Sequence, residues 1–463
     1  MSASITTDPS AAARSAQDDA APGSWVEGWL QRIEPAWVGA ALFLLALGVY
    51  VASNPVRADF YDHFVWQAHA FLQGRTAIEW PVTSGPHQNA HLQDVLPIPG
   101  TGTALLPFPP LPAIVLLPFV AVFGLGTNGA LVAAVLGALN VTLCWVMLLS
   151  VTRSRSAALL ATLFYGFGTV AWYAAMLGST WFLAHVVAST FLFLAITVAL
   201  RRDPDLSGSD RPQGLSAGVM AGLLLGLAGL ARLTTIFGAP FFALVGVGGS
   251  FLSRVVVAGL GAGLPLGLLV AYNLLTTGHV LHPAYQHLYE VEYRPRPELV
   301  NPEWGIEDVR YIPQNAGIML AWPPETPLLS DPACRGEPAP EGLGILLDRR
   351  CPLLRPDPLG MSLLLASPAY LLAIPGLLAF WRRRMVLGAA LAVSAIALVD
   401  LAHFSQGWVQ FGYRFSNDFA PFATILVALG IARLGVGLLS IGLVAASVLV
   451  NAWGVWWGVA LGW

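Results

Sequence analysis

Long apolar runs are the feature that most limits what this 463-residue chain can fold into. Runs long enough to cross a bilayer, which takes about 20 residues in a helix, recur along most of the chain. They lie at residues 36–53, 108–124, 128–150, 157–177, 180–200, 215–231, 234–250, 255–275, 361–380, 385–402 and 420–460, and the last can hold two short spans. The sequence therefore predicts an all-α, polytopic transmembrane bundle of about 11 to 12 spans.

The composition excludes a soluble domain and a nucleic-acid-binding protein. Hydrophobic residues make up 56% of the chain and charged residues only 11%, whereas soluble domains carry about 25% charged residues. The net charge of -3 offers no basic surface for nucleic acid. Residues 1–35 are small and polar and lack the apolar stretch of a signal peptide, so we predict a disordered cytoplasmic tail there.

Two long polar segments, residues 54–106 and 276–360, interrupt the apolar pattern. Arginine clusters at 153–155, 201–205 and 381–384 predict the cytoplasmic side by the positive-inside rule. We therefore expect both polar segments to lie on the outer side of the membrane.

This orientation implies three modules after the tail. We expect a transmembrane catalytic module over 36–275, an outer loop over 276–360 and C-terminal transmembrane helices over 361–463. Counting spans from a cytoplasmic N-terminus disagrees with the arginine clusters by one span. Either the proline-rich segment 107–118 does not cross fully, or one run between 215 and 250 is a bent half-span.

The segment RADFYDHFVWQAHAFLQGR, residues 57–75, follows the first apolar run directly. Its apolar residues recur at helical spacing and form one stripe, namely Tyr61, Phe64, Val65, Ala68, Phe71 and Leu72. The opposite face carries Asp59, Asp62, Trp66, His69 and Gln73, and Gly74 supplies a stop. We expect an amphipathic helix along the membrane surface, which would suit a reaction between a lipid-borne substrate and a polar one.

A structural interpretation of the same residues stays open. Asp59 is well placed to cap the helix, and Asp62 could complete a capping box three residues later. His63 and His69 could simply be polar residues at the membrane interface.

Several segments resemble the GT-C superfamily of membrane glycosyltransferases. They are the spacing Asp62, Trp66, Ala70 and Gly74, the proline-rich PFPPLPAIVLLPF, GLLLGLAGLARLTTIFGAPFF at 222–242, AYNLLTTGHVLHPAYQ at 271–286 and GYRFSNDFAPF at 412–422. The pattern is most similar to the protein O-mannosyltransferase and aminoarabinose transferase type, whose members take a sugar from a polyprenyl-phosphate carrier. The Asp-Glu pair usual in the first loop of that family is Asp62-His63 here.

The chemistry implied by this resemblance has a candidate residue for each part. A carboxylate must take the proton of the acceptor hydroxyl, for which we expect Asp62 first and Asp59 second. The departing polyprenyl phosphate is an anion that arginine suits, and Arg232 and Arg414 are the candidates. Substrate-lining candidates are Trp66, His63, His69 and Tyr413. Arg232 could alternatively be a cytoplasmic anchor, and Arg414 could pair with Asp418.

Metal and cysteine chemistry are less clearly indicated. His87 and His91 are spaced i, i+4 in a loop with only Asp94 as a third ligand, so no metal site and no certain cofactor is predicted. Cys334 and Cys351 share one polar loop, where they form either a disulfide or two free thiols.

We expect a glycosyltransferase of the plasma (inner) membrane with its active site on the extracytoplasmic side. Its donor would be a polyprenyl-phosphate sugar, and its acceptor a lipid, a glycan or a protein. The alternatives are a polytopic transporter, which typically shows matching repeats, and a non-catalytic envelope-assembly protein. Matching halves are not visible in the sequence.

Overall fold

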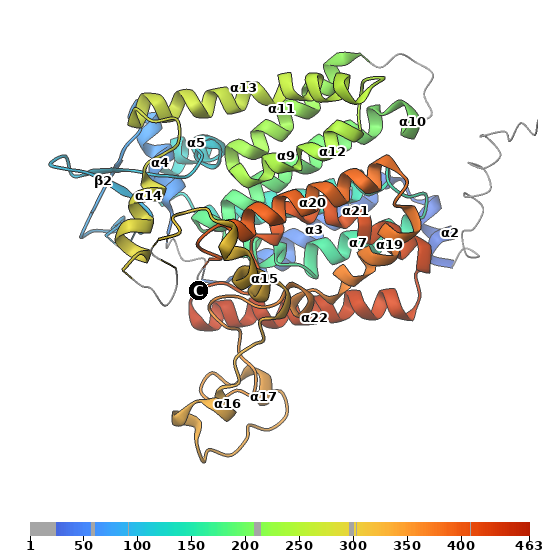
Figure 1. The fold of residues 1–463 in the computed structure, drawn as a ribbon. Helices are drawn as coiled ribbons and strands as arrows, with labels where there is room; N and C mark the ends of the chain where they lie inside the picture. The colour runs from blue at the N-terminus through green and yellow to red at the C-terminus, as the bar shows by residue number, and fades with distance from the viewer. Residues whose placement is uncertain are drawn as a thin grey trace, which may run out of the picture.

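The predicted all-α polytopic architecture is confirmed. The computed structural model describes residues 25–56, 61–90, 92–207, 214–295, 301, 303–407 and 409–463. Asp59 and His91 lie outside the described residues. Figure 1 shows a bundle of long helices with loops gathered at both ends.

Seven helices in the described residues are long and apolar enough to cross a membrane. They are α3 (Pro35–Ser53), α6 (Gly129–Leu148), α9 (Thr180–Arg202), α13 (Phe251–Thr277), α20 (Arg384–Ala402), α21 (Ser416–Leu434) and α22 (Leu438–Leu461). The pair α7 (Arg155–Phe167) and α8 (Ala171–Leu177) is apolar enough to cross together but bends by 48°, and it makes an eighth span if the two helices cross as one.

The remaining predicted spans are shorter apolar helices. They are α5 (Leu111–Phe123) with η1 (Gly124–Gly126), α11 (Leu215–Ala231), η2 (Leu233–Gly238) with α12 (Ala239–Leu244), and η6 (Pro368–Leu372) with α19 (Ala373–Phe380). Prolines shorten or bend such segments because they remove a helical hydrogen bond. Both segments that the sequence marked as incomplete crossings, 107–118 and the run between 215 and 250, belong to this group.

Helices α9 and α21 form the centre of the bundle, since both are mostly buried inside the protein. Small residues let neighbouring helices approach closely, as is common between transmembrane helices. A Cβ on Gly222 of α11 would collide with the carbonyl oxygen of Ala258 on α13. Similarly, a Cβ on Gly430 of α21 would collide with the carbonyl oxygen of Leu372.

Residues 54–106 are called the first outer loop and residues 276–360 the second outer loop, after the side predicted for them. The arginine clusters lie at the end of the bundle opposite the first outer loop (Figure 1). Helix α2 (Trp25–Arg32) lies at this end, within the tail predicted to be disordered, and the structure corrects that boundary. The Glu27 carboxylate accepts hydrogen bonds from the backbone N–H groups of Arg155 and Ser156 at the start of α7. It therefore caps a helix that is distant in sequence. At the same end, Asp203 pairs with Arg384 at 3.3 Å.

The first outer loop contains α4 (His63–Leu72) and a three-stranded antiparallel sheet in the order β1-β3-β2. The strands are β1 (Ile78–Glu79), β2 (Leu96–Ile98) and β3 (Thr103–Leu105). The sheet covers the face of α4 that was expected to be polar and exposed, and Trp66 packs with Ile78 and Ala104. Gly74, at φ +70°, follows the end of α4 as predicted.

The second outer loop contains only short elements. They are α14 (Ala284–Leu288), the π-helical turn η3 (Tyr289–Tyr293), η4 (Val309–Tyr311), α15 (Ile312–Ala321), α16 (Pro327–Ser330), η5 (Pro332–Cys334), α17 (Gly344–Leu347) and α18 (Leu363–Ala366). At the end of the bundle that carries the arginine clusters, α10 (Pro204–Ser207) follows α9.

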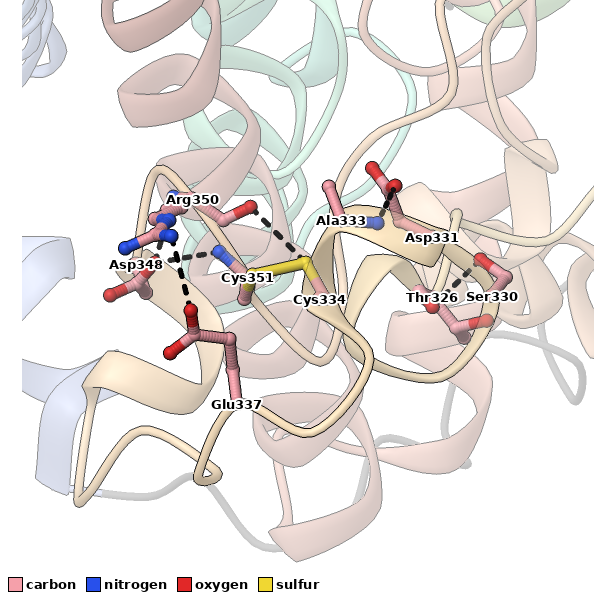
Figure 2. Close-up of a disulfide and its surroundings, with 9 residues drawn as sticks. All are labelled: Thr326, Ser330, Asp331, Ala333, Cys334, Glu337, Asp348, Arg350 and Cys351. Carbon is pink, nitrogen blue, oxygen red and sulfur yellow. Dashed lines mark hydrogen bonds and ion pairs between the residues drawn. A yellow bond between two sulfur atoms is a disulfide. The ribbon is translucent and has the colours of Figure 1, made fainter.

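Helices α16 and α17 belong to a lobe that projects from the bundle (Figure 1). Cys334 and Cys351 form a disulfide inside this lobe, and the ion pair between Arg350 and Glu337 lies beside it (Figure 2). The indole N–H groups of Trp453 and Trp457 on α22 both donate to the carbonyl oxygen of Leu346. The lobe is thus closed by a disulfide and attached to the last helix.

Candidate functional site

A cluster of buried ionisable side chains lies where the loop-side ends of α9, α11, α20 and α21 meet. It contains His185, Arg232, Asp400 and Asp418. Arg232 is placed by the end of α11, where the backbone becomes extended and breaks the helix before η2. Ionisable residues inside a membrane bundle face its interior and are costly unless they serve a function or pair with one another.

Asp418 is the centre of this cluster. Its Oδ2 accepts hydrogen bonds from Arg232 Nη2 at 2.9 Å and from Thr234 Oγ1 at 2.5 Å, and Arg232 Nε lies 3.2 Å from the same oxygen. Its Oδ1 lies 2.6 Å from His185 Nδ1. Both carboxylate oxygens are therefore engaged, and much of the Arg232 guanidinium is occupied by the protein itself.

Arg414 is buried at the same end but is not paired with Asp418, the partner suggested by the sequence. Only 9% of the residue is exposed, and among the residues that the structure describes its Nε has no hydrogen-bond partner. The guanidinium carbon lies 5.3 Å from the Phe415 ring centroid, 5.7 Å from that of Phe182 and 5.8 Å from that of Trp181. Aromatic faces attract a cation but do not neutralise it.

The backbone beside Arg414 is shaped to fit its side chain. A Cβ on Gly407 would lie 2.8 Å from Arg414 Nε, and φ at this glycine is +93°. Burial, followed by the charge of Arg232, lowers the pKa of Arg414 to about 10. The residue is still a cation at neutral pH, and a bound anion would relieve its unfavourable surroundings.

Asp94, in the first outer loop, is held against the same aromatic side chains. Its Oδ2 accepts a hydrogen bond of 2.7 Å from Trp181 Nε1 at the start of α9. Burial raises the pKa of the Asp94 carboxyl, although the Trp181 hydrogen bond and the charge of Arg414 oppose the shift. The Arg414 guanidinium and the Asp94 carboxylate thus contact the ring and the N–H of one indole.

His63 fixes this part of the loop to the bundle. Its Nδ1 lies 2.7 Å from Thr180 Oγ1, and its Nε2 is hydrogen-bonded to the carbonyl oxygen of Gln93. The Tyr61 carbonyl accepts hydrogen bonds from the backbone N–H and the hydroxyl of Thr180. His63 is fully buried, so it serves as a cross-link between α4, the loop and α9.

Asp62 is the N-cap residue of α4, and its side chain makes no capping hydrogen bond. It lines a small pocket with Ser179, Thr180 and Leu183 that has room for about one water molecule. Asp62 is therefore near the start of α9, as Asp94 is, but it lines a pocket with many apolar neighbours.

The other candidates from the sequence lie farther from this point or are covered. Trp66 is buried in an apolar cluster under the sheet. Tyr413 is fully buried, and its hydroxyl donates to Gln406 Oε1 at 2.7 Å. His69 lies near the far end of α4, 2.8 Å from Gln73 Nε2. The residues that the structure describes contain no group of three or more side chains able to hold a metal.

The second outer loop reaches the same region. Burial raises the pKa of Tyr285 to about 12, and the charges of Arg232 and Asp94 both act on its hydroxyl. The Tyr285 ring also packs edge-on against Phe108, 6.5 Å away between centroids. The two outer loops therefore meet over the arginines, as their shared side in the sequence prediction requires.

Five residues of the ionisable cluster and of the Asp94–Trp181 contact were not site candidates in the sequence: Asp94, Trp181, His185, Asp400 and Asp418. A carboxylate and an imidazole inside apolar runs are themselves signals of a functional or paired group, and this signal was present for Asp400 and His185, while Asp418 directly precedes a run. Asp94 and Trp181 gave no such signal, because their proximity depends on how the loop folds over α9.

No protein-family model matches the chain, and no curated protein matches it. Two solved structures of the oligosaccharyltransferase of Archaeoglobus fulgidus are similar to it in arrangement. The apo form has a TM-score of 0.48 at 14% identity, over 93% of this chain and 56% of that one. The complex of this enzyme, AglB, with an inhibitory peptide and a dolichol-phosphate has a TM-score of 0.45 at 11% identity, over 94% and 56%.

This chain thus spans about half the length of those proteins. A similarity of this degree assigns neither an activity nor a substrate to this chain.

Proposed function

We propose that this protein is a membrane glycosyltransferase that moves a sugar from a polyprenyl-phosphate donor to an acceptor hydroxyl on the extracytoplasmic side. The observation that carries the proposal is Arg414, a buried guanidinium at a helix end without a carboxylate partner among the described residues. The phosphate of a membrane-embedded lipid carrier is an anion that would reach the protein at this depth, and the planar guanidinium matches its oxygens.

Arg232 contributes to the same phosphate site indirectly. The guanidinium carbons of Arg232 and Arg414 lie 5.1 Å and 5.3 Å from the centroid of the same Phe415 ring, so the two cations share one region of the site. Because Asp418 occupies Arg232 Nη2 and Nε, we assign the main phosphate contact to Arg414. The donor sugar is proposed to be a hexose or a pentose, as in the mannosyltransferase and aminoarabinose transferase type that the sequence resembles.

The reaction needs a carboxylate as well as a phosphate site. The acceptor oxygen attacks the anomeric carbon, the bond from that carbon to the phosphate oxygen breaks, and a base receives the hydroxyl proton. Asp62 is the base proposed from the sequence, and its position beside Ser179 and Thr180 keeps it near the start of α9. The acceptor is proposed to be a lipid, a glycan or a protein.

The test is transfer of radiolabelled sugar from polyprenyl-phosphate mannose, glucose or arabinose in membranes that carry the protein. Wild type should transfer label from one donor, and Arg414→Gln should transfer at least about tenfold less, because a hydrogen bond to a charged group contributes about 1.5–3 kcal/mol. Arg310→Gln is the matched control, since Arg310 is exposed and forms a surface ion pair with Asp308. Absence of transfer by wild type from every donor would contradict the proposal and favour the transporter or assembly alternatives.

A further inference from the structure

Asp94 is held in one orientation by its neighbours in the first outer loop. The adjacent side chains Leu92 and Val95 are buried in the apolar cluster beneath the sheet. Asp94 itself has φ +62°, a left-handed conformation that aspartate tolerates better than most residues. Such backbone strain persists only where the surroundings fix it, and here the Trp181 hydrogen bond and the two buried neighbours do so.

The two oxygens of this carboxylate differ. Oδ2 accepts the hydrogen bond from Trp181 Nε1, whereas within the described part of the chain Oδ1 has no hydrogen-bond donor. The residue is only half-buried, so Oδ1 can be reached by another molecule. A base that is oriented through one oxygen and open at the other has the geometry needed to receive a proton.

The carboxylate is also placed next to the proposed phosphate site. Arg414 lies over the ring of the same Trp181 whose N–H binds Asp94, and the two charges act on each other. A phosphate bound at Arg414 would therefore bring its sugar close to Asp94. Asp62 lines its own small pocket instead, with neighbours such as Leu116 and Leu177.

We propose that Asp94, rather than Asp62, takes the proton from the acceptor hydroxyl, and that Trp181 is the residue that positions it. This inference rests on the proposed function. The acceptor oxygen forms a bond to the anomeric carbon, and the bond between that carbon and the phosphate oxygen breaks. The electron pair of the broken bond leaves with the polyprenyl phosphate held at Arg414, and the hydroxyl proton moves to Asp94 Oδ1. Asp62 then remains the N-cap residue of α4.

The raised pKa of Asp94 agrees with this role, because a general base works best when its pKa approaches the working pH. Because the residue is half-buried rather than enclosed, the proton can pass from Oδ1 to water after the product leaves.

The experiment compares Asp94→Asn with Asp62→Asn in the radiolabel transfer assay. Asp94→Asn should lower kcat about 10²–10⁴-fold, the usual contribution of general base catalysis, and leave the KM for the donor nearly unchanged. Asp62→Asn should keep kcat within about tenfold of wild type. The reverse order of these two effects would overturn the inference and restore Asp62 as the base.

Two further variants keep the test decisive if Asp94→Asn does not fold. Asp94→Glu retains a carboxylate and should keep partial kcat, and Trp181→Phe keeps a ring under Arg414 but removes the N–H that orients Asp94. Trp181→Phe should lower kcat with little change in the donor KM, whereas a merely structural role would change both or neither. If wild type transfers label and both Asp94→Glu and Trp181→Phe match it in kcat, the inference is wrong while the proposed function stands. If wild type transfers nothing, both fall together.

Discussion

Replacing Asp418 with asparagine should strongly destabilise the protein, because it leaves the Arg232 cation buried without its counter-charge. The Asp418 side chain is 0% exposed and that of Arg232 20% exposed. Removing one partner of a buried ion pair costs about 3–5 kcal/mol. The partial exposure of Arg232 lets water reach its guanidinium, so we expect a loss near the lower limit, about 3 kcal/mol in the free energy of unfolding.

A double-mutant cycle separates this effect from general damage to the core. Asp418→Asn, Arg232→Met and the double variant would be unfolded with denaturant in detergent micelles and followed by tryptophan fluorescence. The double variant should lose less stability than the sum of the single variants, by up to about 3 kcal/mol. Breaking the exposed pair of Arg310 and Asp308, where Arg310 is 56% exposed, should change stability far less, because water screens exposed charges.

The cycle refutes the reasoning if the two single effects simply add, within about 0.5 kcal/mol. In that case Arg232 and Asp418 would not depend on each other for stability. Arg232 would then be free to act as the main phosphate ligand in place of Arg414.

Three further predictions concern other parts of the structure. Burial opposes ionisation of Glu27, but hydrogen bonds from the start of α7 lower its pKa from 4.5 to about 2. The cap that Glu27 forms is therefore complete above pH 4.5 and is lost as the pH falls toward 2. Hydrogen exchange in α2 should accelerate in that pH window, and Glu27→Gln should accelerate it at neutral pH. Gly430→Val should lower stability by about 1–3 kcal/mol, because its Cβ meets the backbone of η6, while Gly442→Val, with open space around it, should not. Reduction of the disulfide between Cys334 and Cys351 should speed proteolysis of the lobe, since a loop of 17 residues gains about 3 kcal/mol from closure; unchanged cleavage would show that its attachment to α22 suffices.

The sequence predicted the helices well, because each is specified locally by a long apolar run. Every predicted span contains helical structure, although only seven helices of the described residues, or eight spans with the bent pair, are long enough to cross a membrane against the 11 to 12 predicted. Residues 54–106 and α14 lie at the end of the bundle opposite the arginine clusters, as these local signals predicted, whereas the lobe with α16 and α17 projects from the side (Figure 1).

The site was predicted only in part, because its contacts join segments far apart in the chain. Arg232 and Arg414 were recognised as cations near apolar runs, but their different environments depend on Asp418, which lies 186 positions after Arg232. The sequence paired Asp418 with Arg414, its near neighbour, whereas the break after α11 brings Arg232 to it instead.

The first outer loop shows a second limit of local patterns. The periodicity of residues 61–73 correctly predicted α4, but it assigned the side of Trp66 to an exposed face. The short strands after α4 cover that face, and strands of two or three residues leave almost no periodic signal. The same folding of the loop carries Asp94 to Trp181.

The most direct test of the account is binding of polyprenyl phosphate, the product left after sugar transfer, to the purified protein in detergent. Its affinity would be measured for wild type, Arg414→Gln and the control Arg310→Gln. The account predicts that Arg414→Gln raises the Kd by about tenfold or more, while the control binds as wild type does. Equal affinity of Arg414→Gln and wild type would contradict the assignment of Arg414 as the phosphate site and, with it, the central claim.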